Sequence, residues 1–384
     1  MLLTALFLCA LSLRPQIIGI GPLLPRIQAD LGATHGVVGL LSTLPVLCMG
    51  VFAPVAGVIA GRIGAKQAIT LSLAANGIFG IARAFAPGTA SLLVLTVAVG
   101  LPIAIAGALL PVVVKQSFAH QPALATAMYT AGIQIGSVSS AGIAAPLAVA
   151  TGSWRPVLAV FSLTILGTTG VWLWAARGYH TPRHGGSPPG LPLGSGMAWL
   201  LVVIFFLQAV PYYGLSAWLP SFLLENGWPE ARAGGSIALM NVGTLTGTLG
   251  IAPFADRRGA RRSYLAASSL VVTLGTIGLL LAPGMGALLC IVVGVALGTL
   301  FPLVLTLPLD VASRPADVGA VTAMMFGIGY TLAALAPTGL GFIRDLSGDF
   351  NASLWVLVGV SALLTALTLM LSPRRLADGI PGRV

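Results

Sequence analysis

The stretch "ALSLRPQIIGIGPLLP" places Arg14, followed by Pro15, near the middle of a long apolar run at the start of the chain. A guanidinium at the centre of a membrane-spanning helix costs about 2.5–3.5 kcal/mol on insertion scales, and this cost is tolerated where the side chain faces water or a partner. The planar fork of N–H donors suits a carboxylate-like or linear anion. We therefore expect Arg14 to line a wet central cavity and to bind an anionic or strongly dipolar ligand there.

A structural interpretation of Arg14 also remains open. Because Pro15 has no N–H, a backbone carbonyl of the preceding turn loses its partner, and the guanidinium could donate to that carbonyl instead. The predicted spans contain no Asp, Glu, Lys or His as a partner, and acids such as Asp30 lie outside them. The other arginine inside a span, Arg83, lies close to Pro87 at the end of its span, where we expect it to reach the interface by snorkelling.

Other polar side chains fall near the middle of predicted spans, and each could bind a ligand or bond to a neighbouring helix. Gln208 and Tyr212 are four residues apart, so they share one face of a helix. Ser137 and Tyr213 lie at a similar depth. Together with Arg14, these groups predict a small, mostly apolar pocket with few donors. The predicted substrate-binding residues are Arg14, Gln134, Gln208, Tyr212, Asn241 and Tyr330.

The composition places the chain in a membrane. Of its 384 residues, 57% are hydrophobic and only 7% are charged, and its mean hydropathy is +0.99, whereas a soluble fold needs more charge to face water. The net charge of +10 does not indicate nucleic-acid binding, because the basic residues are scattered in short groups without interleaved aromatic residues. Cys9, Cys48 and Cys290 lie in apolar runs without metal-ligand spacing, which is typical of packing residues.

Continuous apolar runs long enough to cross the hydrocarbon, about 20 residues each, predict an all-α membrane protein with twelve transmembrane helices. Their expected limits are 2–23, 37–60, 67–86, 90–114, 123–148, 156–176, 198–223, 233–255, 263–282, 286–309, 318–341 and 353–372. A transmembrane barrel is excluded, since its strands alternate apolar and polar residues. Trp218 is predicted to be an aromatic anchor at the membrane interface.

The basic residues between the spans predict the orientation. With a cytoplasmic N-terminus, thirteen Lys and Arg lie on the cytoplasmic side, and only Arg26, Arg155, Arg232 and Arg344 lie on the other. We therefore expect a multi-pass protein of the inner membrane with both termini in the cytoplasm. The first run has no positive n-region, so it is not a cleavable signal peptide. Because the chain starts almost inside this run, we expect that a short N-terminal tail is missing from it.

The longest connection, 177–196, is rich in Gly and Pro and is predicted to be a flexible cytoplasmic linker. It divides the chain into an N-terminal six-helix bundle over 1–176 and a C-terminal one over 197–384. His180 and His184 in this linker are spaced like a helical pair, but the surrounding Pro and Gly forbid a helix. We therefore predict no metal site there, and no cofactor elsewhere.

The two halves repeat each other at an offset of 195 residues. The matched pairs are Pro25 and Pro220, Gly32 and Gly227, Gly39 and Gly234, Arg62 and Arg257, Gly64 and Gly259, and Lys66 and Arg261. Six spans repeated in the same orientation form a parallel repeat whose halves are related by an axis along the membrane normal. Two such halves can rock against each other about a site at their interface.

At these residues the chain resembles the major facilitator superfamily, whose hallmark is GxxxDRxGRR between spans 2 and 3, repeated between spans 8 and 9. The two copies here are "GVIAGRIGAK" and "APFADRRGARR", although Gly61 stands where the family has Asp. The resemblance implies two pseudo-symmetric six-helix bundles and a conformational latch at the cytoplasmic side. The latch residues it implies are Gly57, Arg62, Gly64, Asp256, Arg257, Gly259 and Arg261.

Four further stretches resemble the cyanate and nitroimidazole transporter branch of that superfamily. They are "LRPQIIGIGPLLPRIQADLG", "LLPVVVKQSF", "YYGLSAWLPSFL" and "GIGYTLAALAPTGLGFIRDLSG". That branch has Asn-Leu-Arg-Pro in span 1, whereas Ser12 replaces the Asn here. The resemblance implies that spans 1, 4, 7 and 10 line the cavity, with help from spans 2, 5, 8 and 11.

These features together predict a secondary transporter, acting as a monomer by alternating access, for a small anionic or strongly polar solute. The chain has no GxxxxGK[ST] loop for a nucleotide. Without a buried acid or His, we expect facilitated transport, anion exchange, or a proton carried with the substrate. The alternative within the same fold is a proton-coupled exporter of drugs or metabolites. We expect no enzyme, because paired acids and GxSxG are missing, and no receptor, because the loops are short.

Overall fold

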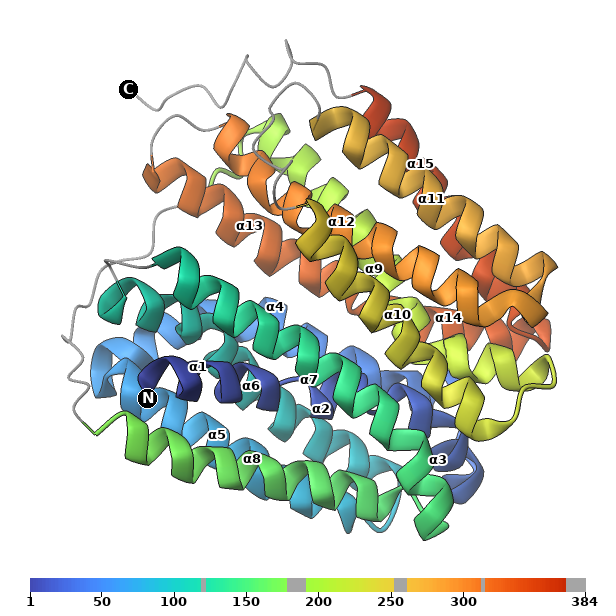
Figure 1. Cartoon of the computed structure of the whole chain (residues 1–384), viewed down its shortest axis with the longest axis horizontal. Coiled ribbons are helices and arrows are strands. Elements are labelled where there is room, and N and C mark those ends of the chain that lie inside the picture. The colour runs from blue at the N-terminus through green and yellow to red at the C-terminus, as the bar shows by residue number, and fades with distance from the viewer. Residues whose placement is uncertain (119–121, 178–190, 252–260, 312–314, 371–384) are drawn as a thin grey trace.

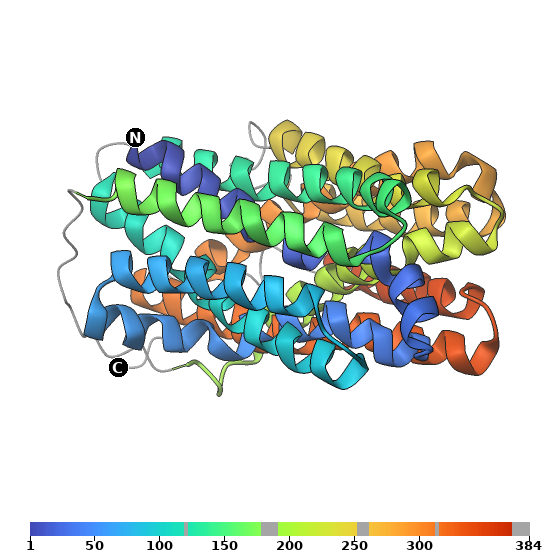
Figure 2. The ribbon, with the colours of Figure 1, turned by 90° about the horizontal axis from the view of Figure 1, so that it is seen from below.

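The computed structural model describes residues 1–118, 122–177, 191–251, 261–311 and 315–370, and its regular elements over these ranges are helices. Figures 1 and 2 show them running side by side along the long axis of the molecule. Ten helical segments in the described part are long and apolar enough to cross a membrane. The predicted spans at 67–86 and, as far as residue 251, at 233–255 fold as helices too, but polar residues such as Asn76 and Asn241 make them less apolar.

The first predicted span is a broken helix. Its segments are α1 (Leu2–Ser12), α2 (Pro15–Ile18), the short 3₁₀ helix η1 (Gly21–Leu23) and α3 (Leu24–Leu31). Pro15, Pro22 and Pro25 stand at the first or second position of the last three segments. A proline is tolerated there because the first turn needs no N–H, but it cannot continue the hydrogen bonds of the preceding turn. The prolines therefore explain why this span is divided.

The other helices match the predicted runs to within a few residues. In the first part of the chain they are α4 (His35–Ile63), α5 (Ala65–Ala84), α6 (Thr89–Ser117), α7 (Pro122–Thr151) and α8 (Arg155–Ala175). In the second part they are α9 (Gly196–Glu225), α10 (Glu230–Ile251), α11 (Arg261–Leu281), η2 (Pro283–Met285), α12 (Gly286–Val311), α13 (Pro315–Ala333), α14 (Leu335–Ser347) and α15 (Asn351–Met370). The eleventh predicted run is divided into α13 and α14 just before Pro337.

The helices form two groups, which we call the first bundle (α1–α8) and the second bundle (α9–α15), as Figure 1 shows. The bundles meet where α4 packs against α13 and α14, and where α7 packs against α10. Gly39 permits the first contact, since a Cβ at this position would lie 2.8 Å from the Pro337 carbonyl oxygen. The interface therefore depends on close approach of the helix backbones.

An ion pair and a set of hydrogen bonds join the bundles at one end of the molecule, which we call the closed end. This end carries the connections 32–34, 226–229 and 348–350. Arg26 binds the Glu230 carboxylate through two nitrogens. Asp345 accepts hydrogen bonds from the backbone N–H groups of His35 and Gly36 and lies 2.7 Å from the His35 Nδ1 atom. Both carboxylates belong to the second bundle, so each pair crosses the interface.

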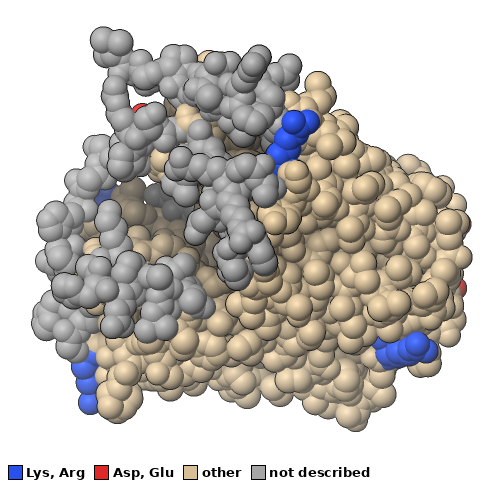
Figure 3. Space-filling model, turned by 45° about the horizontal axis from the view of Figure 1, so that its top comes forward, with Lys and Arg blue, Asp and Glu red and all other residues tan. Residues whose placement is uncertain are grey.

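At the opposite end, which carries Met1 and Ala175 and which we call the open end, the bundles are less tightly packed. Contacts of α4 with the second bundle include Gly36, Gly39 and Gly50, in its closed-end part. Beyond them Gly57 lies on the same face of α4, but it is exposed and a Cβ at this position would meet nothing within 4 Å. Figure 3 shows the surface hollowed toward this end, beside the residues drawn in grey, whereas the visible flank is almost free of charged side chains.

The predicted interfacial role of Trp218 is wrong, because the structure buries this side chain at the closed end. Its exposed fraction is 1%, and its indole N–H donates to the Pro337 carbonyl oxygen at 2.6 Å. The ring packs against His35 of the first bundle and against Phe350, with centroid distances of 5.7 and 5.2 Å. A buried indole needs an acceptor for its N–H, and the carbonyl at the start of α14 provides one.

The hydrogen bonds of Asp345 predict how easily the closed end opens. Removing its carboxylate in Asp345→Ala deletes hydrogen bonds across the bundles, so we expect to lose about 1–2 kcal/mol of closed-end stability, or roughly a 5–30-fold shift in the closed-to-open ratio. The readout is maleimide labelling of Thr43→Cys, whose native side chain is 2% exposed in this interface, after replacement of the native cysteines. Labelling should become several-fold faster.

Asp30→Ala is the matched control, because Asp30 accepts from Trp154 and Arg155 within the first bundle. It removes a carboxylate from the same end without touching the interface, so labelling should stay at the wild-type rate. Equal labelling rates in both variants would contradict the assignment of Asp345 as a link between the bundles.

Candidate functional site

Side chains from both bundles line one pocket of about 510 Å³, a volume that includes the part open to solvent. The lining residues are Arg14, Gln134, Gln208, Ala209, Tyr212, Tyr213, Thr244, Thr248, Leu297, Phe301 and Tyr330. Five of the six predicted substrate-binding residues are among them, although their separation in the chain is large. The structure thus brings these residues together, and their role in binding stays a prediction.

Arg14 lies at the break between α1 and α2, where it is the N-terminal cap residue of α2. The last turn of α1 closes with tighter bonds, from Leu13 N–H to the Ala10 oxygen at 3.3 Å and from Arg14 N–H to the Leu11 oxygen at 3.4 Å. Pro15 has no N–H and cannot extend the helical pattern to Leu11. The break leaves the Arg14 side chain half-buried, with its guanidinium in the pocket.

The neighbours of the Arg14 guanidinium are phenols rather than carboxylates. It lies beside Tyr212, Tyr213 and Tyr330 and within hydrogen-bonding reach of Tyr213. Within the described ranges of the chain, neither a carboxylate nor a backbone carbonyl accepts a hydrogen bond or ion pair from this side chain. The carbonyl alternative raised by Pro15 is therefore not the arrangement seen, and the cation faces the pocket.

Asn241 lies behind the pocket wall rather than in it. Its Oδ1 atom accepts a hydrogen bond from the Tyr212 hydroxyl at 3.1 Å, and its Nδ2 atom donates to the Ile237 carbonyl oxygen at 2.8 Å. With an exposed fraction of 1%, Asn241 does not line the pocket in this structure, and its predicted role in binding stays a prediction. Asn241 instead fixes the orientation of the Tyr212 hydroxyl, which also lies beside Ser137.

Six lining residues are not among the predicted substrate-binding set: Ala209, Tyr213, Thr244, Thr248, Leu297 and Phe301. Tyr213 had a signal in the sequence, because its depth is that of Tyr212, but adjacent helical residues point about 100° apart and only a structure shows which faces the pocket. The others are residue types that face lipid, core or cavity equally often, so the sequence carries no signal for them.

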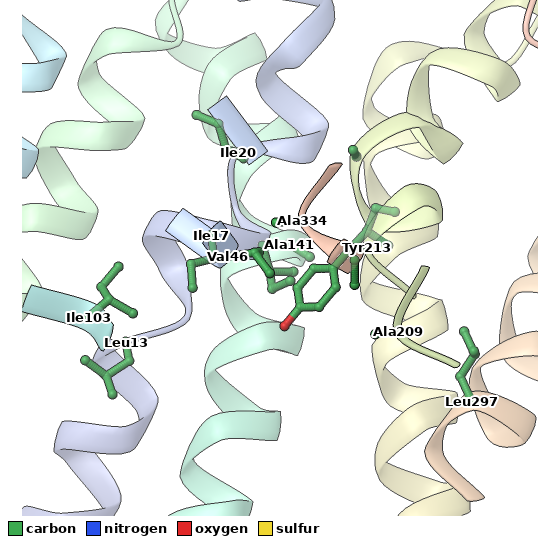
Figure 4. Close-up of a cluster of buried hydrophobic side chains, with 14 of the residues drawn as sticks. Leu13, Ile17, Ile20, Val46, Ile103, Ala141, Ala209, Tyr213, Leu297 and Ala334 are labelled. Carbon is green, nitrogen blue, oxygen red and sulfur yellow. The ribbon is translucent and has the colours of Figure 1, made fainter. Parts of the chain in front are cut away.

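An apolar layer borders the pocket on the side toward the closed end. Figure 4 shows the Tyr213 ring in this layer, in the region where Ile17, Val46, Ala141 and Ala334 come together. All five side chains are buried members of one hydrophobic cluster, and they come from both bundles. The layer separates the pocket from the ion pairs of the closed end.

A second polar network holds the Arg14 segment from behind. Gln16 lies two residues after Arg14 and therefore points to the opposite side of the segment. Its Oε1 atom accepts from Arg83 Nη2 at 2.8 Å, and its Nε2 atom donates to Ser162 Oγ at 2.9 Å. Ser12, before the break, donates to Thr168 Oγ1 at 2.8 Å. These bonds anchor the broken helix to α5 and α8.

The expectation that Arg83 reaches the membrane interface is wrong. Both Arg83 and Gln16 have an exposed fraction of 0%, so the guanidinium is enclosed by the first bundle. The sequence could not show this, because the partner amide is 67 residues away in the chain. A buried charge needs hydrogen-bond partners, and Gln16 supplies the carboxamide and backbone oxygens that Arg83 approaches.

The predicted latch is only partly within the described residues. Gly57 and Arg62 lie near the end of α4, and Arg62 is exposed. Gly64 joins α4 to α5 with a φ of +87°, a conformation that favours glycine. Asp256, Arg257 and Gly259 lie outside the described residues, and so do His180 and His184. Arg261 begins α11.

No group of three His, Cys, Asp or Glu side chains suited to a metal occurs over the residues that the structure describes. Cys9, Cys48 and Cys290 are buried and free of disulfides. The polar groups that the pocket offers are one guanidinium, two amides, three phenols and the hydroxyls of Thr244 and Thr248, within an apolar surround.

The chain is similar to known transporters in both sequence and fold. A sequence profile described as Major Facilitator Superfamily matches residues 2–337. The chain is 30% identical over 377 residues to the cyanate transport protein CynX of Escherichia coli (strain K12), covering 97% of this chain and 98% of the relative. It is 28% identical over 377 residues to the 2-nitroimidazole transporter of the same organism, covering 95% and 93%.

Solved structures with the same fold include the nucleoside transporter NupG, with a TM-score of 0.79 at 13% identity, covering 97% of this chain and all of that one. They also include a bacterial homologue of the human lysosomal transporter Spinster in an inward-facing, unoccupied conformation. Its TM-score is 0.78 at 16% identity, covering 98% of this chain and 97% of that one.

The network behind Arg14 predicts a non-additive pair of substitutions. Gln16→Leu leaves the buried Arg83 guanidinium without its partner amide, so we expect a loss of about 3 kcal/mol in the free energy of unfolding. Arg83→Met should also destabilise, because it strands the Gln16 oxygen. The double variant should be more stable than the sum of the two losses predicts, by at least about 1 kcal/mol. Reversible denaturation in mixed detergent measures all four proteins, and strict additivity would contradict the direct coupling.

Proposed function

The chain belongs to the Major Facilitator Superfamily, and we propose that it moves a small anionic or strongly polar solute with Arg14 as the central anion-binding residue. It is a transporter rather than an enzyme, because the members of its family and its named relatives are transporters. The predicted fold class, an all-α membrane protein of twelve helices in two bundles, is confirmed by the solved structures that share the fold. The predicted resemblance to the cyanate and nitroimidazole transporters is confirmed by the relatives.

One observation supports the anion proposal most strongly: the Arg14 guanidinium stands in the pocket without an acidic partner among the described residues. A charge held in a low-dielectric site attracts an ion of opposite sign far more strongly than it would in water. A cationic drug would instead meet repulsion from Arg14, so the pocket favours the anion transporter over the exporter of cationic compounds. The name of one relative also supports an anionic substrate, because cyanate is an anion.

Alternating access is proposed from the difference between the two ends. The Arg26–Glu230 ion pair and the Asp345 hydrogen bonds hold the bundles together at the closed end, whereas Gly57 of α4, toward the open end, meets no neighbour on the interface side. We propose that the open end is cytoplasmic, because the basic connections predict both termini there. Rocking of the bundles would break the Arg26 and Asp345 links at the closed end. This places the pocket alternately in contact with each side.

We propose that transport is driven by the substrate itself or by a counter-anion, rather than by a proton relay in the protein. The described lining residues include no carboxylate or His that could relay a proton, so the proposed modes are facilitated transport, exchange for a counter-anion, or a proton carried on the substrate. We propose that the protein works as a monomer, because the two bundles of a single chain together line the pocket.

Uptake into proteoliposomes tests the role of Arg14. Radiolabelled cyanate, formate and benzoate are the probes. Arg14→Ala should lower the uptake of every anion that the wild type accepts by at least about tenfold, because a hydrogen-bonded ion pair of roughly 1.5–3 kcal/mol is lost. Arg14→Lys should restore little, since an ammonium lacks the planar fork.

Arg232→Ala is the matched control, because Arg232 lies outside the pocket and stacks on Trp228. Its uptake should equal that of the wild type, which shows that loss of an arginine alone does not abolish transport. Wild-type uptake in Arg14→Ala would overturn the proposal, and so would a wild-type protein that accepts none of the three anions.

A further inference from the structure

We infer that the preferred substrate is a planar aromatic or heteroaromatic anion, larger than a triatomic ion such as cyanate. This inference rests on the proposed function and sharpens its substrate class. It comes from a division of chemistry between the bundles: the first bundle supplies the cation, and the second supplies a wall of aromatic rings. A ligand that satisfies both must carry a charge at one end and a flat π-surface at the other.

The wall consists of four rings that line the pocket, Tyr212, Tyr213, Tyr330 and Phe301, from α9, α12 and α13. Tyr212 and Tyr213 meet edge to face with their centroids 5.2 Å apart, and Tyr213 and Tyr330 meet in the same way at 6.2 Å. Edge-to-face pairs are the geometry that ring quadrupoles favour. The three tyrosine rings of the wall therefore hold one another in fixed orientations.

A second row of rings supports the first. Phe205 is fully buried and packs against Tyr330 at a centroid distance of 4.8 Å and against Phe326 at 5.4 Å. Phe326 in turn lies 5.6 Å from Tyr330. Because Tyr330 is braced on its far side, its accessible surface is presented to the pocket without a cost of ordering on binding. The wall is preorganised, and preorganised surfaces bind with less loss of entropy.

The lining of the pocket separates planar rings from very small anions. A triatomic ion bound to Arg14 has no π-face to lay against the wall, whereas an aromatic carboxylate can pair with the guanidinium and place its ring against the phenols beside it. Pockets lined by aromatic side chains with a few polar groups are typical of organic-ligand sites.

A buried amide adds a requirement for the ring substituent. Gln208 is 4% exposed and lines the pocket, and its Oε1 atom has no hydrogen-bond partner in the described structure. A buried acceptor is costly unless a donor reaches it. A ring N–H or O–H on the substrate would meet that need, so hydroxylated or N–H heteroaromatic anions should bind better than the plain ring.

Calorimetric titration of the purified protein tests the inference with a matched pair of ligands. Benzoate and cyclohexanecarboxylate carry the same charge and nearly the same size, but only benzoate is flat and aromatic. We expect benzoate to bind about threefold to tenfold more tightly, which is the range for one or two ring contacts. Adding a hydroxyl in 4-hydroxybenzoate should tighten binding further, and formate should bind more weakly than either ring acid.

Variants then assign the preference to the wall. Tyr330→Leu should remove most of the preference for benzoate, whereas Tyr330→Phe, which keeps the ring, should retain it. Phe301→Leu serves as a second removal from another helix if Tyr330→Leu is poorly folded. The comparison of ligands in the wild-type protein needs no variant, so it tests the inference even if a variant does not fold.

The outcomes separate this inference from the proposed function. Equal affinities for benzoate and cyclohexanecarboxylate, both lost in Arg14→Ala, would overturn the aromatic inference and leave the anion site standing. Anion binding that survives Arg14→Ala would overturn the proposed function itself. A benzoate preference that disappears in Tyr330→Leu and persists in Tyr330→Phe supports both.

Discussion

The cost of holding a guanidinium inside a membrane constrains this structure more than any other single interaction. Insertion scales put that cost at about 2.5–3.5 kcal/mol, and Arg14 meets it at a break between α1 and α2 rather than with an acid. The break needs Pro15, the tight closing turn needs the Leu13 and Arg14 N–H groups, and the pocket needs the second bundle to bring phenols to the cation. The helix break, the tight turn and the surrounding phenols therefore depend on one another to keep the Arg14 charge inside the membrane.

Two arginines in the first bundle illustrate how position decides role. Arg83 is fully buried and is held by Gln16, so its charge is used for structure. Arg14, two residues from Gln16 and on the opposite side of the same short segment, is left to face the pocket. The buried network thus holds the backbone of the broken helix, and this support allows a charge near a helix break to keep a defined position.

Much of the fold was predictable from the sequence, because apolar runs of about 20 residues have few structural alternatives. The site was predictable only in part: Arg14, Gln134, Gln208, Tyr212 and Tyr330 stood out as polar residues at mid-depth, and the structure brings them together. The rotation of each helix was not predictable, which is why Tyr213 and Phe301 were missed. Partners that are distant in the chain were not predictable either, because the sequence does not show which helices pack together. Arg83 and Trp218 were therefore predicted to lie at the membrane interface, although tertiary contacts bury them.

The most direct test of the account is the charge selectivity of the pocket, measured as a ratio of dissociation constants for an anion and its neutral isostere. Calorimetry with benzoate against benzamide, and with formate against formamide, gives this ratio for the wild-type protein and for Arg14→Gln. If Arg14 is the anion anchor, the wild type should favour each anion by about tenfold to a hundredfold, and Arg14→Gln should favour neither. An unchanged preference for the anions in Arg14→Gln would contradict the central claim.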